Sequence, residues 1–218
     1  MRAKGIIFDM DGVLVDNMAV HGEVFRLFCE KYGHRNDVYD INRYAGMGNA
    51  DIIPAVIPAD VGSKYGVEWL GDEKERMYRE YYADKMKPAE GIVSFLEGLR
   101  GLGIKRAVGS SGQELNVNFV LDGCDLRQYF DAIVNGDMVE HHKPEPDIFL
   151  LAASKLGLPP ESCVVVEDSL SGIAAAHRAG MKVIAITTTF PREELEKHHP
   201  TLIIDSFTEL TATEAISL

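Results

Sequence analysis

Short apolar runs alternate with stretches of helical periodicity along most of the chain, and this alternation limits the possible fold more than any other feature. Val164-Val165-Val166 is the clearest buried strand, and a helical pattern follows it that Gly180 closes. Comparable runs predict further strands at residues 5–8, 105–109, 132–135, 182–186 and 202–204. Strands that alternate with helices form right-handed βαβ units. We therefore predict an α/β fold with a doubly wound, mostly parallel, Rossmann-like sheet.

One region departs from this pattern. Residues 36–86 are polar, contain Pro54 and Pro58, and include no convincing buried strand. A helical pattern at residues 17–32 comes directly before them. We predict an inserted α-helical cap domain at residues 17–86 and a catalytic core formed by residues 1–16 and 87–218. Two linkers that run side by side permit hinge closure of one domain over the other.

Composition and charge exclude several classes of protein. The formal net charge of -12 argues against broad nucleic-acid binding, which needs a basic face, but leaves an anionic substrate possible. The three cysteines lie far apart and form no CxxC pair, which makes a zinc site or disulfide framework unexpected. The chain has no signal-peptide pattern and no apolar stretch long enough for a membrane span. We expect a cytoplasmic protein that binds neither nucleic acid nor membrane, and a monomer.

The predicted strand ends carry an unusual set of polar residues. Ligands of doubly wound sheets bind at the carboxyl ends of the strands. The residues at or after these ends are Asp9 and Asp11, Ser110-Ser111-Gly112, Lys143, and Glu167-Asp168. Four carboxylates at one edge repel one another unless a cation joins them. Oxygen ligands without His or Cys point to a hard cation, Mg²⁺ before Ca²⁺.

These motifs together resemble the haloacid dehalogenase superfamily, in its subgroup of small-molecule phosphatases and β-phosphoglucomutases with a helical cap. The matching segments are FDMDGVLVD at residues 8–16, Ser110, HKPEPDIF at residues 142–149 and VVVEDSLSGI at residues 164–173. They occur in order, and the similarity covers essentially the whole chain.

The resemblance implies a role for each of these residues. Asp9 is the expected nucleophile that forms an aspartyl phosphate, and Asp11 is the expected general acid and then base. Mg²⁺ would bind the Asp9 and Asp168 carboxylates and the Asp11 backbone carbonyl, with Glu167 acting through a bound water or from behind the ligands. Ser110, the Ser111 amide and Lys143 would bind the phosphate. An active-site lysine supports little packing, so we expect Lys143→Ala to leave folding nearly unchanged.

Each motif also has a purely structural interpretation. Asp9 and Asp11 can be turn residues, Ser110 and Ser111 helix caps, Lys143 a solvated lysine, and Glu167-Asp168 the first acids of a helix. His21 can face the substrate or be a partly buried helix residue. The tyrosines at residues 78–82 are expected in the cap core rather than around a substrate.

The predicted function is Mg²⁺-dependent hydrolysis of a small phosphorylated metabolite, such as a sugar phosphate. The alternative is an isomerase of the β-phosphoglucomutase type. Mutases of the family place an arginine in a Gly-x-Ser-Arg segment of the cap, where this chain has Asn49, a candidate substrate residue without charge. Lys74, Arg76 or Arg79 could supply the missing charge. A non-catalytic protein is disfavoured because all the expected catalytic residues are intact.

Overall fold

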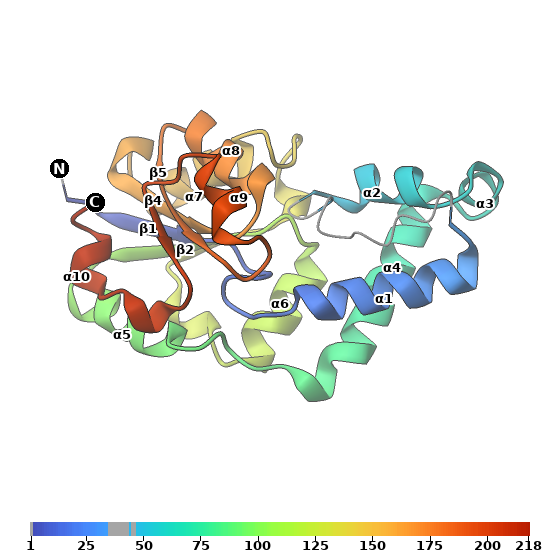
Figure 1. Ribbon diagram of the computed structural model, residues 1–218, viewed down its shortest axis with the longest axis horizontal. Coiled ribbons are helices and arrows are strands. Elements are labelled where there is room, and N and C mark those ends of the chain that lie inside the picture. The colour runs from blue at the N-terminus through green and yellow to red at the C-terminus, as the bar shows by residue number, and fades with distance from the viewer. Residues whose placement is uncertain (1, 35–43, 45–46) are drawn as a thin grey trace.

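The computed structural model describes residues 2–34, 44 and 47–218, which form a sheet-containing part and a helical part (Figure 1). The strands are β1 (Gly5–Phe8), β2 (Lys105–Gly109), β3 (Ala132–Val134), β4 (Cys163–Glu167), β5 (Lys182–Ile186) and β6 (Leu202–Ile204). The α-helices are α1 (Met18–Tyr32), α2 (Asn49–Val56), α3 (Ala59–Tyr65), α4 (Val67–Tyr82), α5 (Ile92–Gly101), α6 (Glu114–Gly123), α7 (Asp147–Leu156), α8 (Leu170–Arg178), α9 (Arg192–Glu196) and α10 (Ala212–Ala215). Short 3₁₀ helices are η2 (Ala83–Lys85), η3 (Arg127–Tyr129), η4 (Gly136–Met138), η5 (Pro160–Ser162) and η6 (Phe207–Glu209).

The six strands form one parallel sheet in the order β3-β2-β1-β4-β5-β6. In the centre, Ile7 of β1 pairs with Ala107 of β2 on one side and with Val165 of β4 on the other. The chain adds strands in one direction from β1 and then returns to add β4 to β6 on its other side. The strand order therefore reverses between β1 and β4, the place where doubly wound sheets bind ligands.

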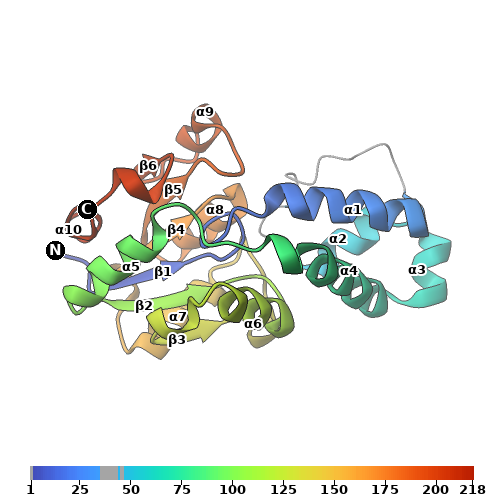
Figure 2. The same ribbon diagram turned by 90° about the horizontal axis from the view of Figure 1, so that it is seen from below.

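Helices cover both faces of the sheet because the strands are apolar on both sides (Figure 2). Ile6 and Phe8 point into the layer formed by α5, α6 and α10, whereas Ile7 points into the layer formed by α7, α8 and α9. All three side chains are fully buried. The strand at the centre of the site is therefore held rigidly from both faces.

The helical part has small cores of its own. Phe28, Ile53 and Leu70 bring α1, α2 and α4 together, and Tyr78 and Tyr82 of α4 pack beside α1. Both of these tyrosines are buried, as the sequence suggested, whereas Tyr81 between them is exposed. In Figure 1 this group of helices lies at the opposite end of the molecule from the two chain termini.

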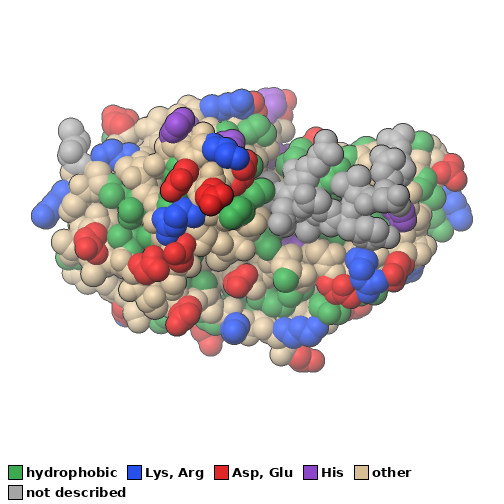
Figure 3. Space-filling view, viewed as in Figure 1, with side chains coloured by type: hydrophobic (Ala, Val, Ile, Leu, Met, Phe, Trp, Pro, Cys, Tyr) green, Lys and Arg blue, Asp and Glu red, His purple; other side chains and the backbone are tan. Residues whose placement is uncertain are grey.

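The predicted fold class is confirmed, an α/β core with an inserted helical part. Strands β1, β2, β5 and β6 have the predicted bounds, whereas β3 ends one residue earlier than predicted and β4 is one residue longer at each end. The division at residues 16 and 87 stays a prediction. On the face drawn in Figure 3, acidic and basic side chains are interspersed. Among the described residues, no helix combines the length and apolar character of a membrane span.

Candidate active site

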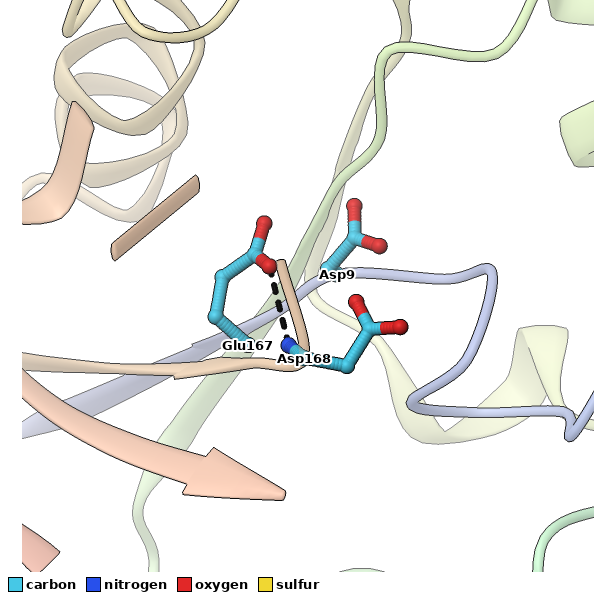
Figure 4. Close-up of side chains that lie close together, drawn as sticks. All are labelled: Asp9, Glu167 and Asp168. Carbon is cyan, nitrogen blue, oxygen red and sulfur yellow. Dashed lines mark hydrogen bonds between the residues drawn. The ribbon is translucent and has the colours of Figure 1, made fainter. Parts of the chain in front are cut away.

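Asp9 and Asp168 lie at the carboxyl ends of the adjacent strands β1 and β4, where the strand order reverses. Figure 4 shows their carboxylates side by side, with Glu167 next to them. Single oxygens of these three carboxylates lie within 4.8 Å of one another, and all three residues are buried. The structure therefore brings together the acidic residues that the sequence placed at two separate strand ends.

Glu167 uses both of its oxygens inside the protein. Its Oε2 accepts hydrogen bonds from the backbone N–H groups of Asp168 and Ser169 and from the Ser169 hydroxyl. Its Oε1 accepts a hydrogen bond of 2.5 Å from Lys143. Gly172 also packs so closely that a Cβ there would overlap this carboxylate. Glu167 is not part of the cavity lining, and its hydrogen bonds hold Lys143 and the start of α8 in position.

Lys143 joins this carboxylate to the expected nucleophile. Its Nζ donates hydrogen bonds to Asp9 Oδ1 at 2.6 Å and to Glu167 Oε1, and its side chain has no exposed surface. Burial alone lowers the pKa of Lys143, but the charges of Asp9 and Glu167 outweigh it and raise the pKa. The lysine therefore stays protonated and holds one oxygen of Asp9 in place.

The loop after β1 is built around Asp168. Gly12 has a φ of 77° and lies so close to Asp168 that a Cβ at position 12 would overlap its carboxylate. Thr189, which follows β5, donates a hydrogen bond to Asp168 Oδ2, and Thr188 donates one of 2.5 Å to the Gly12 carbonyl. Only glycine combines this positive φ with this close approach.

The carboxylates at this edge carry more negative charge than the protein compensates. Burial is the main cause that raises the pKa of Asp9 to about 7, and the charges of Glu167 and Asp11 add to it while Lys143 opposes them. Burial, with the charges of Glu167 and Asp9, also raises the pKa of Asp168 well above its ordinary value. A bound cation would favour the ionised forms of both carboxyl groups and so lower their pKa values.

Asp11 is held by two residues at the start of α1. Asn17 donates a hydrogen bond of 2.5 Å to Asp11 Oδ1, and His21 Nε2 lies 3.5 Å from the same oxygen. Burial raises the Asp11 pKa, but His21 and Asn17, together with the charge of Lys74, outweigh it and lower the pKa. Asp11 is therefore anchored as a carboxylate at the border between core and cap.

Asn17 links the core loop to the cap. It is fully buried, accepts a hydrogen bond from the Gly12 N–H, and donates one of 2.7 Å to the Tyr78 hydroxyl on α4. The His21 ring stacks on the Tyr78 ring with centroids 4.2 Å apart. A displacement of α4 would therefore move Asn17, which is hydrogen bonded both to Tyr78 and to Asp11.

The residues that are expected to bind phosphate lie at the end of β2. Ser110 is buried at the strand end, and its Oγ accepts a hydrogen bond from the Gly112 N–H. Ser110, Ser111 and Gly112 line the cavity. Gly136 packs against the Ser111 carbonyl so closely that a larger residue would displace this loop.

A cavity of about 420 Å³ separates this edge from the cap. Its core side includes Asp9, Asp11, Asp168, Ser110 and Ser111, and its cap side includes His21, Asn49, Lys74 and Glu75. The predicted substrate residues His21 and Asn49 therefore both reach the cavity. Gly46, which begins the stretch corresponding to the Gly-x-Ser-Arg segment of the mutases, lies outside the described residues.

The structure distinguishes between the three cationic residues considered in the cap. Lys74 lines the cavity, whereas Arg76 pairs with Glu73 and Glu80 on the surface. Arg79 is not part of the cavity lining, but it donates a hydrogen bond of 2.5 Å to Asn116 of α6, which is. Of the three residues that could supply the missing charge, Lys74 is the one that lines the cavity among the described residues.

Several residues of the site were not predicted from the sequence. Thr188 and Thr189 follow a predicted strand, so the strand-end rule could have found them had it been applied to β5. Asn17 adjoins the first motif, which was a weak signal. Glu75 and Asn116 carried no signal, because their importance depends on contacts between segments 41 residues apart.

The residues at the core edge fit a hard divalent cation. Their donors are carboxylate oxygens, with no cysteine or histidine in the buried group of Asp9, Glu167 and Asp168. Burial and the neighbouring carboxylates raise the pKa of Asp9 and of Asp168, and a bound cation would oppose both effects. Because both oxygens of Glu167 are already hydrogen bonded, Asp9 and Asp168 are the side chains best placed to bind the ion.

Comparison with known proteins agrees with this geometry. Residues 6–186 match the model of the haloacid dehalogenase-like hydrolase family. The chain belongs to this family. The expected enzyme class, a phosphoric monoester hydrolase, is confirmed by relatives that are named phosphatases.

Three similar proteins show the range of the family. Fructose-1-phosphate phosphatase YqaB of Escherichia coli is 34% identical over 85% of this chain and 97% of its own length. Protein SUPPRESSOR OF QUENCHING 1 of Arabidopsis thaliana is 33% identical over 99% of this chain, which spans only 21% of that longer protein. The crystal structure of a β-phosphoglucomutase from Clostridium difficile superposes with a TM-score of 0.82 at 26% identity, covering 96% of this chain and 93% of the mutase.

Proposed function

We propose that this haloacid dehalogenase-like hydrolase is a Mg²⁺-dependent phosphatase of a small phosphorylated metabolite, such as a sugar phosphate, and works through a phosphoaspartate on Asp9. The observation that carries the proposal is the placement of Asp9 and Asp168 at neighbouring strand ends, with Lys143 bonded to Asp9 at 2.6 Å. A relative that is named for fructose 1-phosphate supports the substrate class.

Substrate binding uses the ends of β2 and β4. The phosphoryl group would accept hydrogen bonds from Ser110 and from the Ser111 amide, which line the cavity beside Asp9. The Asp9 and Asp168 carboxylates and the Asp11 carbonyl would hold Mg²⁺, which supplies positive charge to the phosphoryl oxygens when bound. Lys143 donates a hydrogen bond to Asp9, so the nucleophile keeps its orientation as the phosphate approaches.

Proton transfer is assigned to Asp11. In the first half of the reaction it gives a proton to the leaving oxygen, and in the second half it accepts one from the attacking water. The protein alone lowers its pKa, but the negative charge of a phosphate ester next to it raises the pKa again. Asn17 and His21 keep the carboxylate directed into the cavity through both halves.

The cap favours hydrolysis over the mutase reaction. A mutase must bind a second phosphate while the first end of the sugar reacts, and an arginine serves this purpose through paired hydrogen bonds. Asn49 is uncharged and donates its N–H to Glu75 at 2.8 Å. Because the cap does not bind the second phosphate of a bisphosphate tightly, water reaches the phosphoaspartate.

We also propose that the protein is a cytoplasmic monomer. The three free cysteines are consistent with a reducing compartment.

The test is a screen of phosphorylated metabolites with Mg²⁺ that includes fructose 1-phosphate, and product analysis with β-glucose 1-phosphate plus a trace of glucose 1,6-bisphosphate. We expect release of inorganic phosphate as the dominant reaction. Rapid formation of glucose 6-phosphate with little free phosphate would establish the isomerase instead. A fully metal-independent rate would contradict the proposed chemistry.

A further inference from the structure

Lys74 and Glu75, adjacent on α4, both line the cavity and both are buried. Their side chains are only 4% and 8% exposed, and Lys74 Nζ lies 2.8 Å from Glu75 Oε1. Lys74 Nζ also lies 3.2 Å from His21 Nδ1 and 4.7 Å from the centre of the Phe25 ring. The ammonium group is therefore surrounded by partners of the cap itself.

Both carboxylate oxygens of Glu75 accept hydrogen bonds from within the protein. Its Oε1 accepts hydrogen bonds from Lys74 and from Asn49, and its Oε2 accepts one of 2.5 Å from Asn116 on the core helix α6. Burial raises the Glu75 pKa, but the charge of Lys74, with smaller contributions from His21 and Asn49, outweighs it and lowers the pKa. Glu75 is thus ionised at neutral pH and cancels the charge of Lys74 within the cavity.

The remaining charges of the cavity lining do not reverse this balance. Glu68 adds a carboxylate on the cap side and Asp137 adds one on the core side. In the part of the chain that the structure describes, Lys74 is the only lysine or arginine in the lining. The cap side is therefore neutral to acidic, and the uncharged amides in the lining include Asn49 on the cap side and Gln113 on the core side.

We infer that Glu75 is a specificity-determining residue that restricts the enzyme to monophosphates whose remainder is uncharged and carries hydroxyl groups. This inference rests on the proposed function. A second phosphate near the cap would meet a buried carboxylate and a lysine whose charge is already compensated. Selection against an unwanted ligand by a like charge is a general device of specific sites. Neutral hydroxyl groups meet no such repulsion.

The experiment compares kcat/KM for fructose 1-phosphate and for fructose 1,6-bisphosphate in the wild type and in Glu75→Gln, with Mg²⁺ present. Glutamine has nearly the same shape but no charge, so it leaves the charge of Lys74 available. We expect the preference for the monophosphate to fall by about ten- to a hundredfold, the range of one charged hydrogen bond to phosphate. An unchanged ratio in a folded variant contradicts the inference.

Matched variants separate charge from structure. Glu75→Asp keeps the charge and should keep the preference. Asp72→Asn removes a charge from the same helix outside the cavity lining and should also keep it. In the double variant Lys74→Met/Glu75→Gln, kcat/KM for the bisphosphate should return to the wild-type value relative to the monophosphate. If the gain of Glu75→Gln persists in the double variant, the charge that Glu75 compensates is not that of Lys74. Glu75→Ala provides the same neutralisation should Glu75→Gln not fold.

Binding without turnover distinguishes this inference from the proposed function. Calorimetric titration of both fructose phosphates into Asp9→Asn, with and without Glu75→Gln, reports the same preference in an inactive background. If the wild type hydrolyses neither ester and no other compound of the metabolite screen, the proposed function fails while the binding ratio still tests Glu75. If hydrolysis is normal but Glu75→Gln leaves both ratios unchanged, only the role of Glu75 is wrong.

Discussion

The core side and the cap side of the cavity both bury carboxylates, yet the net pKa shift of Asp9 and Asp168 is opposite to that of Glu75. On the core side the pKa of Asp9 is raised to about 7, and that of Asp168 is raised well above its usual value. On the cap side the pKa of Glu75 is lowered, because Lys74 lies 2.8 Å away. The core shares one lysine between Asp9 and Glu167. This difference supports the proposal of an external cation for the core edge, whereas the cap edge carries its own compensating charge.

Replacing the nucleophile should have the largest effect. Asp9→Asn keeps the shape of the side chain but removes the attacking carboxylate, so phosphate release should fall at least about a thousandfold. The rate of phosphate release is measured with the best substrate of the screen, and circular dichroism checks the fold. A rate close to that of the wild type would assign the nucleophile to another residue or to water.

Removing the shared lysine should damage both activity and stability. Lys143→Ala should lower the rate about a hundredfold, the usual loss for one electrostatic group. The sequence alone suggested that folding would be nearly unaffected, but the structure changes this expectation. Asp9 and Glu167 would be left buried without their cation, which costs about 3 kcal/mol of unfolding free energy or more.

Denaturant unfolding of Lys143→Ala measures this loss of stability, and Lys155→Ala provides the matched control. Lys155 lies on α7, is exposed, and has no carboxylate partner among the described contacts. Its replacement should leave both activity and stability unchanged. Equal stability of the two variants would mean that Lys143 does not compensate the buried carboxylates.

Magnesium bound at the core side of the cavity should increase the free energy of unfolding of the protein. At a concentration of about one hundred times its dissociation constant, an ion that binds only the folded protein adds about 2.7 kcal/mol, or roughly 5–10 °C in melting temperature for a chain of this size. Asp168→Asn should lose most of this shift, whereas Glu75→Gln should retain it. A shift that survives in Asp168→Asn would place the ion elsewhere.

The smallest expected effect concerns the contact between cap and core. Asn116 on α6 accepts a hydrogen bond from Arg79 and donates one to Glu75, so Asn116→Ala should cost about 1–3 kcal/mol of stability and increase hydrogen exchange in α4. Asn118→Ala is the control, since Asn118 on the same helix accepts a hydrogen bond from Arg127 within the core. Equal exchange in α4 for both variants would show that Asn116 does not hold the cap.

The sequence was informative about the core because its elements are local. Short apolar runs predicted β1, β2, β5 and β6 with their observed bounds, and the rule that ligands lie at strand ends brought Asp9, Lys143 and Asp168 together in one predicted site. The cap side could not be predicted in the same way. Whether Lys74 offers its charge to a substrate depends on Glu75 reaching the same cavity, and this depends on how α4 packs against α1 and α6.

Trapping the covalent intermediate tests the central claim most directly. Enzyme mixed with substrate and Mg²⁺ is quenched within the first turnover, reduced with borohydride, digested and examined by mass spectrometry. An acyl phosphate is reduced to the alcohol, so the account predicts homoserine at position 9, absent without substrate and absent in Asp9→Asn. Active enzyme in which Asp9 stays unmodified at every quench time, or in which another carboxylate is reduced, would contradict the account.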